Sequence, residues 1–180
     1  MNTSERNSFQ LSYQVSPIVL TGGIATNISG AMLPIINLLQ AQDYGEGPLG
    51  GSSSSSSLDD YFAQFIPLPG STLIDNQLGT YPFANQTTAA NAIIAQPLAI
   101  ALMMICPVRG SSTYAAKRAT ITNLQSQLAK HSSQGGTYTI VTPSFVYTNC
   151  ILTTLRDVSD GEARQPQIKW QWEFVQPLLT

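Results

Sequence analysis

The segment Gln167–Val175, QIKWQWEFV, gives the clearest structural signal in the chain. Hydrophobic side chains occupy every second position, at Ile168, Trp170, Trp172 and Phe174, and polar or charged residues stand between them. Because successive side chains of a β-strand point to opposite faces, this alternation predicts a strand with an aromatic face in the core. Stacking on a sugar or a base is the alternative for the two tryptophans, but their even spacing favours the core.

Three further segments upstream read as strands. Thr137–Val141 is one, and Phe145–Leu155 is another, with Phe145, Tyr147, Asn149, Ile151 and Leu155 predicted on one face and Tyr147 in the core. The apolar run Ile93–Val108 contains Pro97 and Pro107. The stretch between these prolines has the length of a strand, and it predicts a buried strand from about Ala99.

One segment reads clearly as a helix, from about Tyr114 to His131. Ser111–Thr113 offers N-cap residues, and Gly135-Gly136 ends the element. The apolar face consists of Tyr114, Ile121, Leu124 and Leu128. His131 follows Lys130 in the last turn, where a cation suits the helix dipole, so we expect a capping or solvated histidine.

The N-terminal half is less regular. Phe9–Leu20 predicts a strand ending at a Gly22-Gly23 turn, and Ala31–Gln40 predicts a short helix, with a strand as the alternative. Asp43–Asn91 is punctuated by glycine, proline and a serine run, and predicts a long loop or arm. We therefore expect one domain over residues 1–180, mainly antiparallel β with one main helix and residues 43–91 as an insertion.

Formal charge is scarce and unevenly placed. Only 10% of the 180 residues are Asp, Glu, Lys or Arg, against roughly 25% in ordinary soluble domains. None lies between Asn7 and Gln42 or between Asn76 and Val108. Charged residues are depleted in the cores of protein interfaces because their desolvation is costly. The two neutral stretches therefore predict surfaces covered by other proteins, although an uncharged polar surface on a monomer is an alternative.

Seven residues are candidates for such an interface. The aromatic candidates lie in or near the expected arm: Tyr61, Phe62, Phe65, Tyr81 and Phe83. Arg156 and Asp157 begin a charged loop that extends to Pro166 and could dock a partner.

The sequence offers no constellation for catalysis or cofactor binding. His131 is the only histidine, and neither a G-x-S-x-G nor a G-x-x-x-x-G-K-[ST] motif occurs. The acidic groups around Asp59 and Asp157 read as capping or solvated residues rather than metal ligands. A net charge of −2 gives no basic footprint for nucleic acid, and no apolar run suits a membrane span. We expect no enzyme, cofactor, metal, membrane or sequence-specific nucleic-acid partner.

The two cysteines, Cys106 and Cys150, stand among apolar or β-type neighbours. We expect both to act as small buried hydrophobic residues. Because the first ten residues lack the features of a signal peptide, we expect synthesis in the cytoplasm and no disulfide.

Two segments resemble a known family. Ser16–Gln40, SPIVLTGGIATNISGAMLPIINLLQ, looks like the N-terminus of tail and baseplate proteins of contractile-tailed bacteriophages. Phe145–Leu178 has a strand patterned Y-x-N-x-x-L-x-x-L-x-D from Tyr147 to Asp157, a charged loop, and W-x-F-x-Q-P-L from Trp172 to Leu178. This part resembles the C-terminal region of Dit-like tail proteins, which are related to the tail-tube fold.

The resemblance covers about a third of the chain and has specific implications. It implies a β-barrel or sandwich with a flanking helix, no active site, and a homo-oligomeric ring, with six subunits favoured, among other tail or baseplate proteins of the virion. The position within the tail stays open: tube terminus, hub or baseplate clamp. A carbohydrate- or cell-surface-binding β module is the alternative, using the exposed aromatic residues Tyr61, Phe62, Tyr81 and Phe83.

Overall fold

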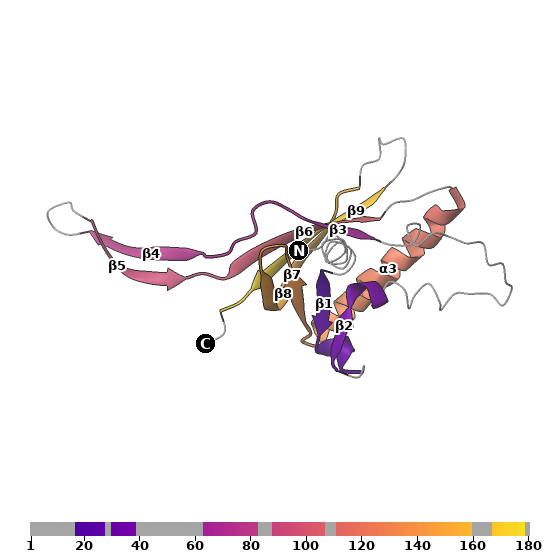
Figure 1. The fold of residues 1–180 in the computed structure, drawn as a ribbon, viewed down its shortest axis with the longest axis horizontal. Coiled ribbons are helices and arrows are strands. Elements are labelled where there is room, and N and C mark those ends of the chain that lie inside the picture. The colour runs from indigo at the N-terminus through magenta and orange to yellow at the C-terminus, as the bar shows by residue number, and fades with distance from the viewer. Residues whose placement is uncertain are drawn as a thin grey trace, which may run out of the picture.

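The fold is mainly antiparallel β-structure, as the sequence predicted. The computed structural model describes residues 17–27, 30–38, 63–82, 88–106, 111–159 and 167–178. Seven strands form one sheet in the order β2-β1-β7-β8-β9-β6-β3, and two form a separate hairpin, β4-β5 (Figure 1). The strands are β1 (Ile18–Thr21), β2 (Met32–Pro34), β3 (Gln64–Pro67), β4 (Asn76–Pro82), β5 (Thr88–Ala95), β6 (Leu98–Cys106), β7 (Thr137–Val141), β8 (Val146–Asp157) and β9 (Ile168–Gln176). The helices include the 3-10 helix η1 (Gly23–Asn27) and the long helix α3 (Ser111–Ser133).

The large sheet is bent but open. The first half of β8 pairs with β7 and the second half with β9, so the long strand joins two halves of the sheet. At Asn149 an extra residue interrupts the pairing with β7, and φ there is 55°, a conformation that asparagine tolerates better than most residues. Among the described residues β2 and β3 are the end strands and do not pair with each other. The resemblance implied a barrel or a sandwich, and among the described residues the sheet is not closed into a barrel.

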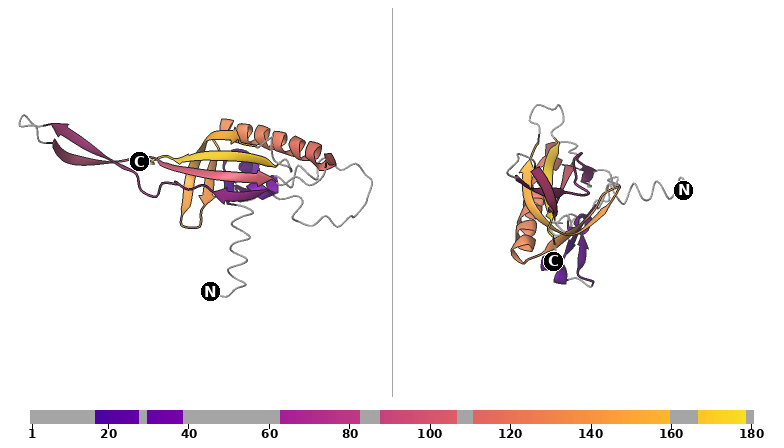
Figure 2. Two further views of the ribbon diagram at one scale, coloured as in Figure 1. Left: turned by 90° about the horizontal axis from the view of Figure 1, so that it is seen from above. Right: turned by 90° about the vertical axis from the view of Figure 1, so that its left-hand side faces the viewer.

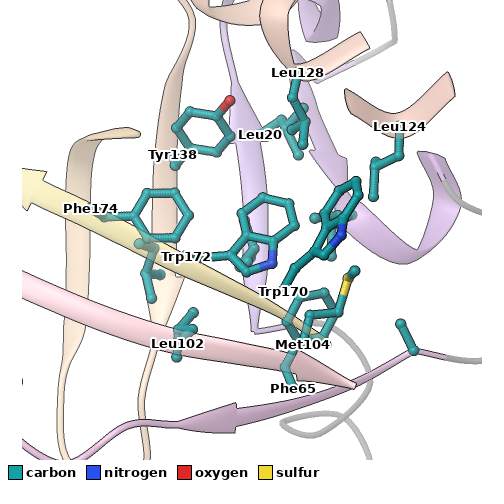
Figure 3. Close-up of a cluster of buried hydrophobic side chains, with 14 of the residues drawn as sticks. Leu20, Phe65, Leu102, Met104, Leu124, Leu128, Tyr138, Trp170, Trp172 and Phe174 are labelled. Atoms are coloured by element: carbon teal, nitrogen blue, oxygen red, sulfur yellow. The ribbon is translucent and has the colours of Figure 1, made fainter. Parts of the chain in front are cut away.

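The core lies between β9, β6 and α3. Along β9 the side chains of Ile168, Trp170, Trp172 and Phe174 are buried, as predicted. Trp172 stacks on Phe174 with ring centroids 6.1 Å apart and tilts against Trp170 at 6.4 Å (Figure 3). The helix contributes buried side chains at three of the predicted positions, Ile121, Leu124 and Leu128. Tyr147, the remaining predicted core residue, is also fully buried.

Two expected interpretations are wrong in detail. Ile151 is exposed whereas Cys150 is buried, because the bulge at Asn149 shifts the alternation of β8. Phe145 is exposed because it lies in the turn before β8, where its backbone hydrogen-bonds to Thr142. Of the expected helix Ala31–Gln40, residues 31–38 are described, and of these residues 35–38 are helical. Met32–Pro34 instead forms β2, since positive φ angles at Gly30 and Ala31 turn the chain back onto β1. The expected strand Phe9–Leu20 is described only from residue 17.

His131 is fully buried, which corrects the expectation of a capping or solvated side chain. The ring meets Tyr138 edge-on with centroids 4.8 Å apart, and Nε2 donates to the Thr137 carbonyl oxygen at 3.1 Å. Two glycines make room for it. A Cβ atom on Gly136 would overlap the imidazole ring, and one on Gly23 would lie 2.7 Å from Nδ1. Tertiary contacts with η1 and β7, rather than the helix dipole, decide the environment of this residue.

Burial of His131 predicts that the protein loses stability in mild acid. Desolvation lowers the pKa of His131 below 6.5, and the hydrogen bond to Thr137 only partly opposes this. As pH falls below 6.5 the unfolded chain therefore takes up a proton that the native state does not bind. The free energy of unfolding should drop by up to about 1.4 kcal/mol per pH unit in that window. Urea titrations between pH 7.5 and 5.5 measure this slope.

A His131→Gln variant is the control, because glutamine keeps a neutral donor for the Thr137 carbonyl but does not titrate. Its stability should change less with pH over the same range. Equal slopes for the two proteins would show that His131 does not set the pH dependence.

Both cysteine side chains are buried, as expected. Burial raises the pKa of the Cys150 thiol to about 12. At neutral pH this thiol is protonated, and it acts as a packing group on the inner side of β8.

Candidate interaction surface

The most prominent surface feature is a β-ribbon that begins at one edge of the sheet. β3 pairs with β6, and β4 pairs with β5 further along the same two chain segments. Between the two pairs, backbone hydrogen bonds continue the ladder: Leu68 N–H to Ala101 C=O at 3.0 Å, Thr72 N–H to Ala99 C=O at 2.8 Å, and Gln96 N–H to Asp75 C=O at 2.8 Å. The described residues 64–82 and 88–106 thus form one long ribbon, of which the part made by β3 and β6 packs on the core.

The outer part of this ribbon, β4 with β5, projects away from the body of the protein, and we call it the arm. Figure 1 shows it extending from the sheet, and the view from above in Figure 2 shows it clear of α3. A bulge between Gly79 and Thr80 shifts its register. The arm thus presents both faces and both edges beyond the core.

Exposed aliphatic side chains gather on the arm. Leu78 is 57% exposed, and its cross-strand partner Ile93 is 73% exposed. Ile94, one position along and therefore on the opposite face, is 50% exposed. The segment contains no charged residue. Exposed apolar groups that gather in one place mark protein–protein or membrane interaction sites or ligand-binding grooves.

A two-stranded hairpin is only marginally stable in water on its own, and open strand edges invite pairing with other chains. Charged side chains are a common protection against such pairing. The arm carries no charge that could serve this purpose. Its chemistry suits a segment that becomes buried rather than one that stays in solvent.

The root of the arm is tied to the body. Tyr147 of β8, fully buried, donates its hydroxyl to the Thr72 carbonyl oxygen at 3.1 Å. Gln96 donates a side-chain hydrogen bond to Gln77 across the first positions of the hairpin at 3.3 Å. The arm therefore leaves the sheet in a defined direction.

A hollow of about 230 Å³ lies on the outer face of the sheet beside the root of the arm. Ala99 and Ala101 of β6 line it, together with Glu173 and Val175 of β9 and the turn at residues 69–70. The Glu173 carboxylate accepts a hydrogen bond from Gln171 at 3.1 Å and pairs with Arg156 at 3.5 Å. A larger groove of about 370 Å³ lies between α3 and β8 and is lined partly by Leu128, Leu155 and Asp157.

The predicted interface residues are distributed unevenly. Phe65 is not an interface residue: it is 1% exposed because its register opposite Met104 points it inward, edge-on to Trp172 at 6.1 Å. Arg156 and Asp157 are exposed at the end of β8. Tyr61 and Phe62 lie outside the described residues, as do Phe83 and the side chain of Tyr81.

The expected long insertion at residues 43–91 contains strands where it is described. β3, β4 and the first part of β5 fall within it, whereas residues 43–62 and 83–87 lie outside the described ranges. Leu78, Ile93 and Ile94 were not among the predicted interface residues. The signal that could have indicated them is the uncharged stretch from Asn76 onward.

The chain matches no protein-family model, and a search of curated proteins gives no significant match. Among the described residues, no helix is both long enough and apolar enough to cross a membrane.

Proposed function

We propose that the protein is a structural subunit of a bacteriophage tail or baseplate, made in the host cytoplasm and incorporated in the virion, and that it acts through protein–protein contacts. The observation that carries this proposal is the arm, which is uncharged over its whole length and exposes Leu78, Ile93 and Ile94 to solvent in the single chain. Burial of apolar area stabilises association by about 25 cal/mol per Å² before the costs of ordering are subtracted.

The sequence resemblance supports the same proposal. The segment Ser16–Gln40 contributes β1, η1 and β2, and the segment Phe145–Leu178 contributes β8 and β9. These strands occupy one continuous part of the sheet, with only β7 between them. In this proposal the bent sheet and its helix α3 are a form of the tail-tube type of fold that is completed by neighbouring subunits rather than closed within one chain.

A closed ring of identical subunits fits the features of the arm. Ring subunits need contacts that join one face of a copy to a different face of the next. They also have to cover sheet edges that would otherwise pair without control. The arm supplies a projecting contact surface, and β2 and β3 are the end strands of the sheet in the described part of the chain. The number of six subunits in the ring and the presence of additional tail proteins are proposed from the sequence resemblance alone.

The alternative, a carbohydrate-binding module, lacks an observation in its favour. It depends on Tyr61, Phe62, Tyr81 and Phe83, whose side chains lie outside those described. Trp170 lines the groove beside α3 but is only 9% exposed, which leaves little ring surface for stacking on a sugar.

A gene replacement tests the proposed function. In the genome that encodes the chain, Leu78→Lys combined with Ile93→Glu places two opposite charges on facing positions of the arm. The cross-strand ion pair should preserve the hairpin, because opposite charges at facing positions are favourable. Burial in an interface, however, becomes costly. We expect particles without tails, or with incomplete tails, in electron micrographs.

The matched control is Thr122→Lys combined with Ser126→Glu, which places the same charges on exposed positions of α3. This variant should produce normal particles. Normal tails from the arm variant, or from a strain that lacks the gene, would contradict the proposed function.

A further inference from the structure

The hollow beside the root of the arm is lined by small side chains of β6. β6 alternates strictly: Ile100, Leu102 and Met104 point into the core and are buried, so Ala99 and Ala101 face outward. These small residues leave space where larger ones would fill the outer face. The turn at residues 69–70 borders that space.

The charged side chain that lines the hollow already has polar partners, so it does not prevent an aliphatic side chain from lying there. Its one described carboxylate, that of Glu173, pairs with Arg156 and accepts a hydrogen bond from Gln171. No residue of β6 carries a charge. The remaining lining side chains include the methyl groups of Ala99, Ala101 and Val175. Thr153 also lines the hollow, and its hydroxyl donates a hydrogen bond to the Glu173 carbonyl oxygen at 2.9 Å. An uncharged branched aliphatic side chain matches this lining, whereas a charged guest would lose its hydration without a partner.

The same chain carries a suitable guest. Leu78 and Ile93 are cross-strand partners on one face of the arm, and both are more than half exposed. The strands of the arm have seven and eight residues, similar to the nine of β6 that an arm would lie against. Leu78 and Ile93 of the arm and Ala99 and Ala101 of the hollow all belong to the uncharged stretch from Asn76 to Val108.

A chain cannot place this pair in its own hollow. Only Gln96 and Pro97 separate β5 from β6, and the Gln96 N–H bonds to the Asp75 carbonyl, so the arm leads away from β6 rather than back over it (Figure 2). The guest therefore has to come from another molecule. A second copy of the chain supplies an uncharged arm, and arms and hollows are then present in equal numbers.

We propose that the hollow at Ala99 and Ala101 receives the Leu78–Ile93 pair of the arm of a second copy of this chain. The proposal rests on the proposed function and names the partner of the arm. It joins two different surfaces of the protein, so repetition of the contact produces a ring if the rotation closes and a filament if it does not. Two copies that exchange arms reciprocally would satisfy both sites in a dimer.

Disulfide trapping tests the contact. Two full-length variants, Ile93→Cys and Ala99→Cys, are coexpressed with different tags and oxidised. A disulfide requires Cα atoms within about 7 Å, so it reports direct proximity. The native Cys106 and Cys150 are buried and compete little for the introduced thiols. We expect a cross-linked heterodimer on a non-reducing gel. Ile93→Cys with Asn123→Cys, an exposed position on α3, is the matched control and should not cross-link.

A second experiment fills the hollow with a larger side chain. Ala99→Trp should weaken association by about tenfold or more, as expected for blocking an interface pocket, while leaving the melting temperature close to that of the wild type. If the wild type assembles but the Ile93–Ala99 cross-link is absent or no stronger than the control, the hollow is not the acceptor and the proposed function stands. If the wild-type chain does not assemble at all, both proposals fail.

Discussion

Replacement of Trp172 by alanine is expected to lower the free energy of unfolding by about 3–5 kcal/mol. The side chain is fully buried and contacts Phe65 edge-on and Phe174 face-on, each with ring centroids 6.1 Å apart. Its removal leaves a cavity beside Phe65 of β3 and Phe174 of β9. Because a whole domain is stable by only about 5–15 kcal/mol, this variant should be close to unfolding. Urea denaturation followed by far-ultraviolet circular dichroism measures the change.

Two control variants test whether the loss of stability comes from the buried ring. Trp172→Phe should cost less, because Trp172 Nε1 is buried without a hydrogen-bond partner and phenylalanine removes that group while it keeps most of the volume. Phe145→Ala, at an exposed aromatic position, should change stability by well under the Trp172→Ala loss. If Phe145→Ala and Trp172→Ala cost the same, the assigned core is wrong.

The second large effect is expected for Gly136→Ala. The added Cβ would overlap the His131 ring, which is held by the hydrogen bond to the Thr137 carbonyl and by contact with Tyr138. Overpacking of this kind typically costs about 1–3 kcal/mol. The cost arises from the ring, because Gly136 is not among the residues with positive φ. Thermal and urea denaturation of the variant check the value.

A double-mutant cycle isolates the cause. In a His131→Ala background the ring is absent, so Gly136→Ala should be nearly neutral there, and the coupling energy between the two sites should exceed about 1 kcal/mol. Additive effects of the two substitutions would show that the glycine is required for another reason.

The elements with strong periodicity could be predicted from the sequence. β9, β6 and α3 each bury one regular set of side chains, so their hydrophobic spacing indicates both the element and its inner face. β8 was predicted as a strand, but the positive φ at Asn149 changes which residues face inward beyond that point. The sequence does not locate this bulge, because Cys150 and Ile151 are both apolar and only Cys150 is buried. The burial of His131 was missed because Gly23, which helps to make room for the ring, lies on the distant element η1, and Gly136 was interpreted as the end of the helix.

The candidate interaction surface could be predicted only as a region. Absence of charge from Asn76 onward marked the stretch, but the strands β4 and β5 lack the alternation by which half-buried strands are recognised. Leu78 and Ile94 lie on opposite faces of the arm, and both are exposed. A hairpin without a core on either side is therefore indistinguishable from an apolar loop at the level of sequence. Phe65 was misassigned because it lies just before this region, where the ribbon still packs on the core.

Sedimentation of the isolated full-length chain over a wide concentration range is the most direct measurement. If neutral, aliphatic surfaces on the projecting hairpin exist to be covered by protein, the wild type should sediment as a discrete multimer of the 19.4 kDa chain. The variant with Leu78→Lys and Ile93→Glu should sediment as a folded monomer under the same conditions. A wild-type protein that stays a compact 19.4 kDa monomer at every concentration, and is found in no larger particle, would contradict the account.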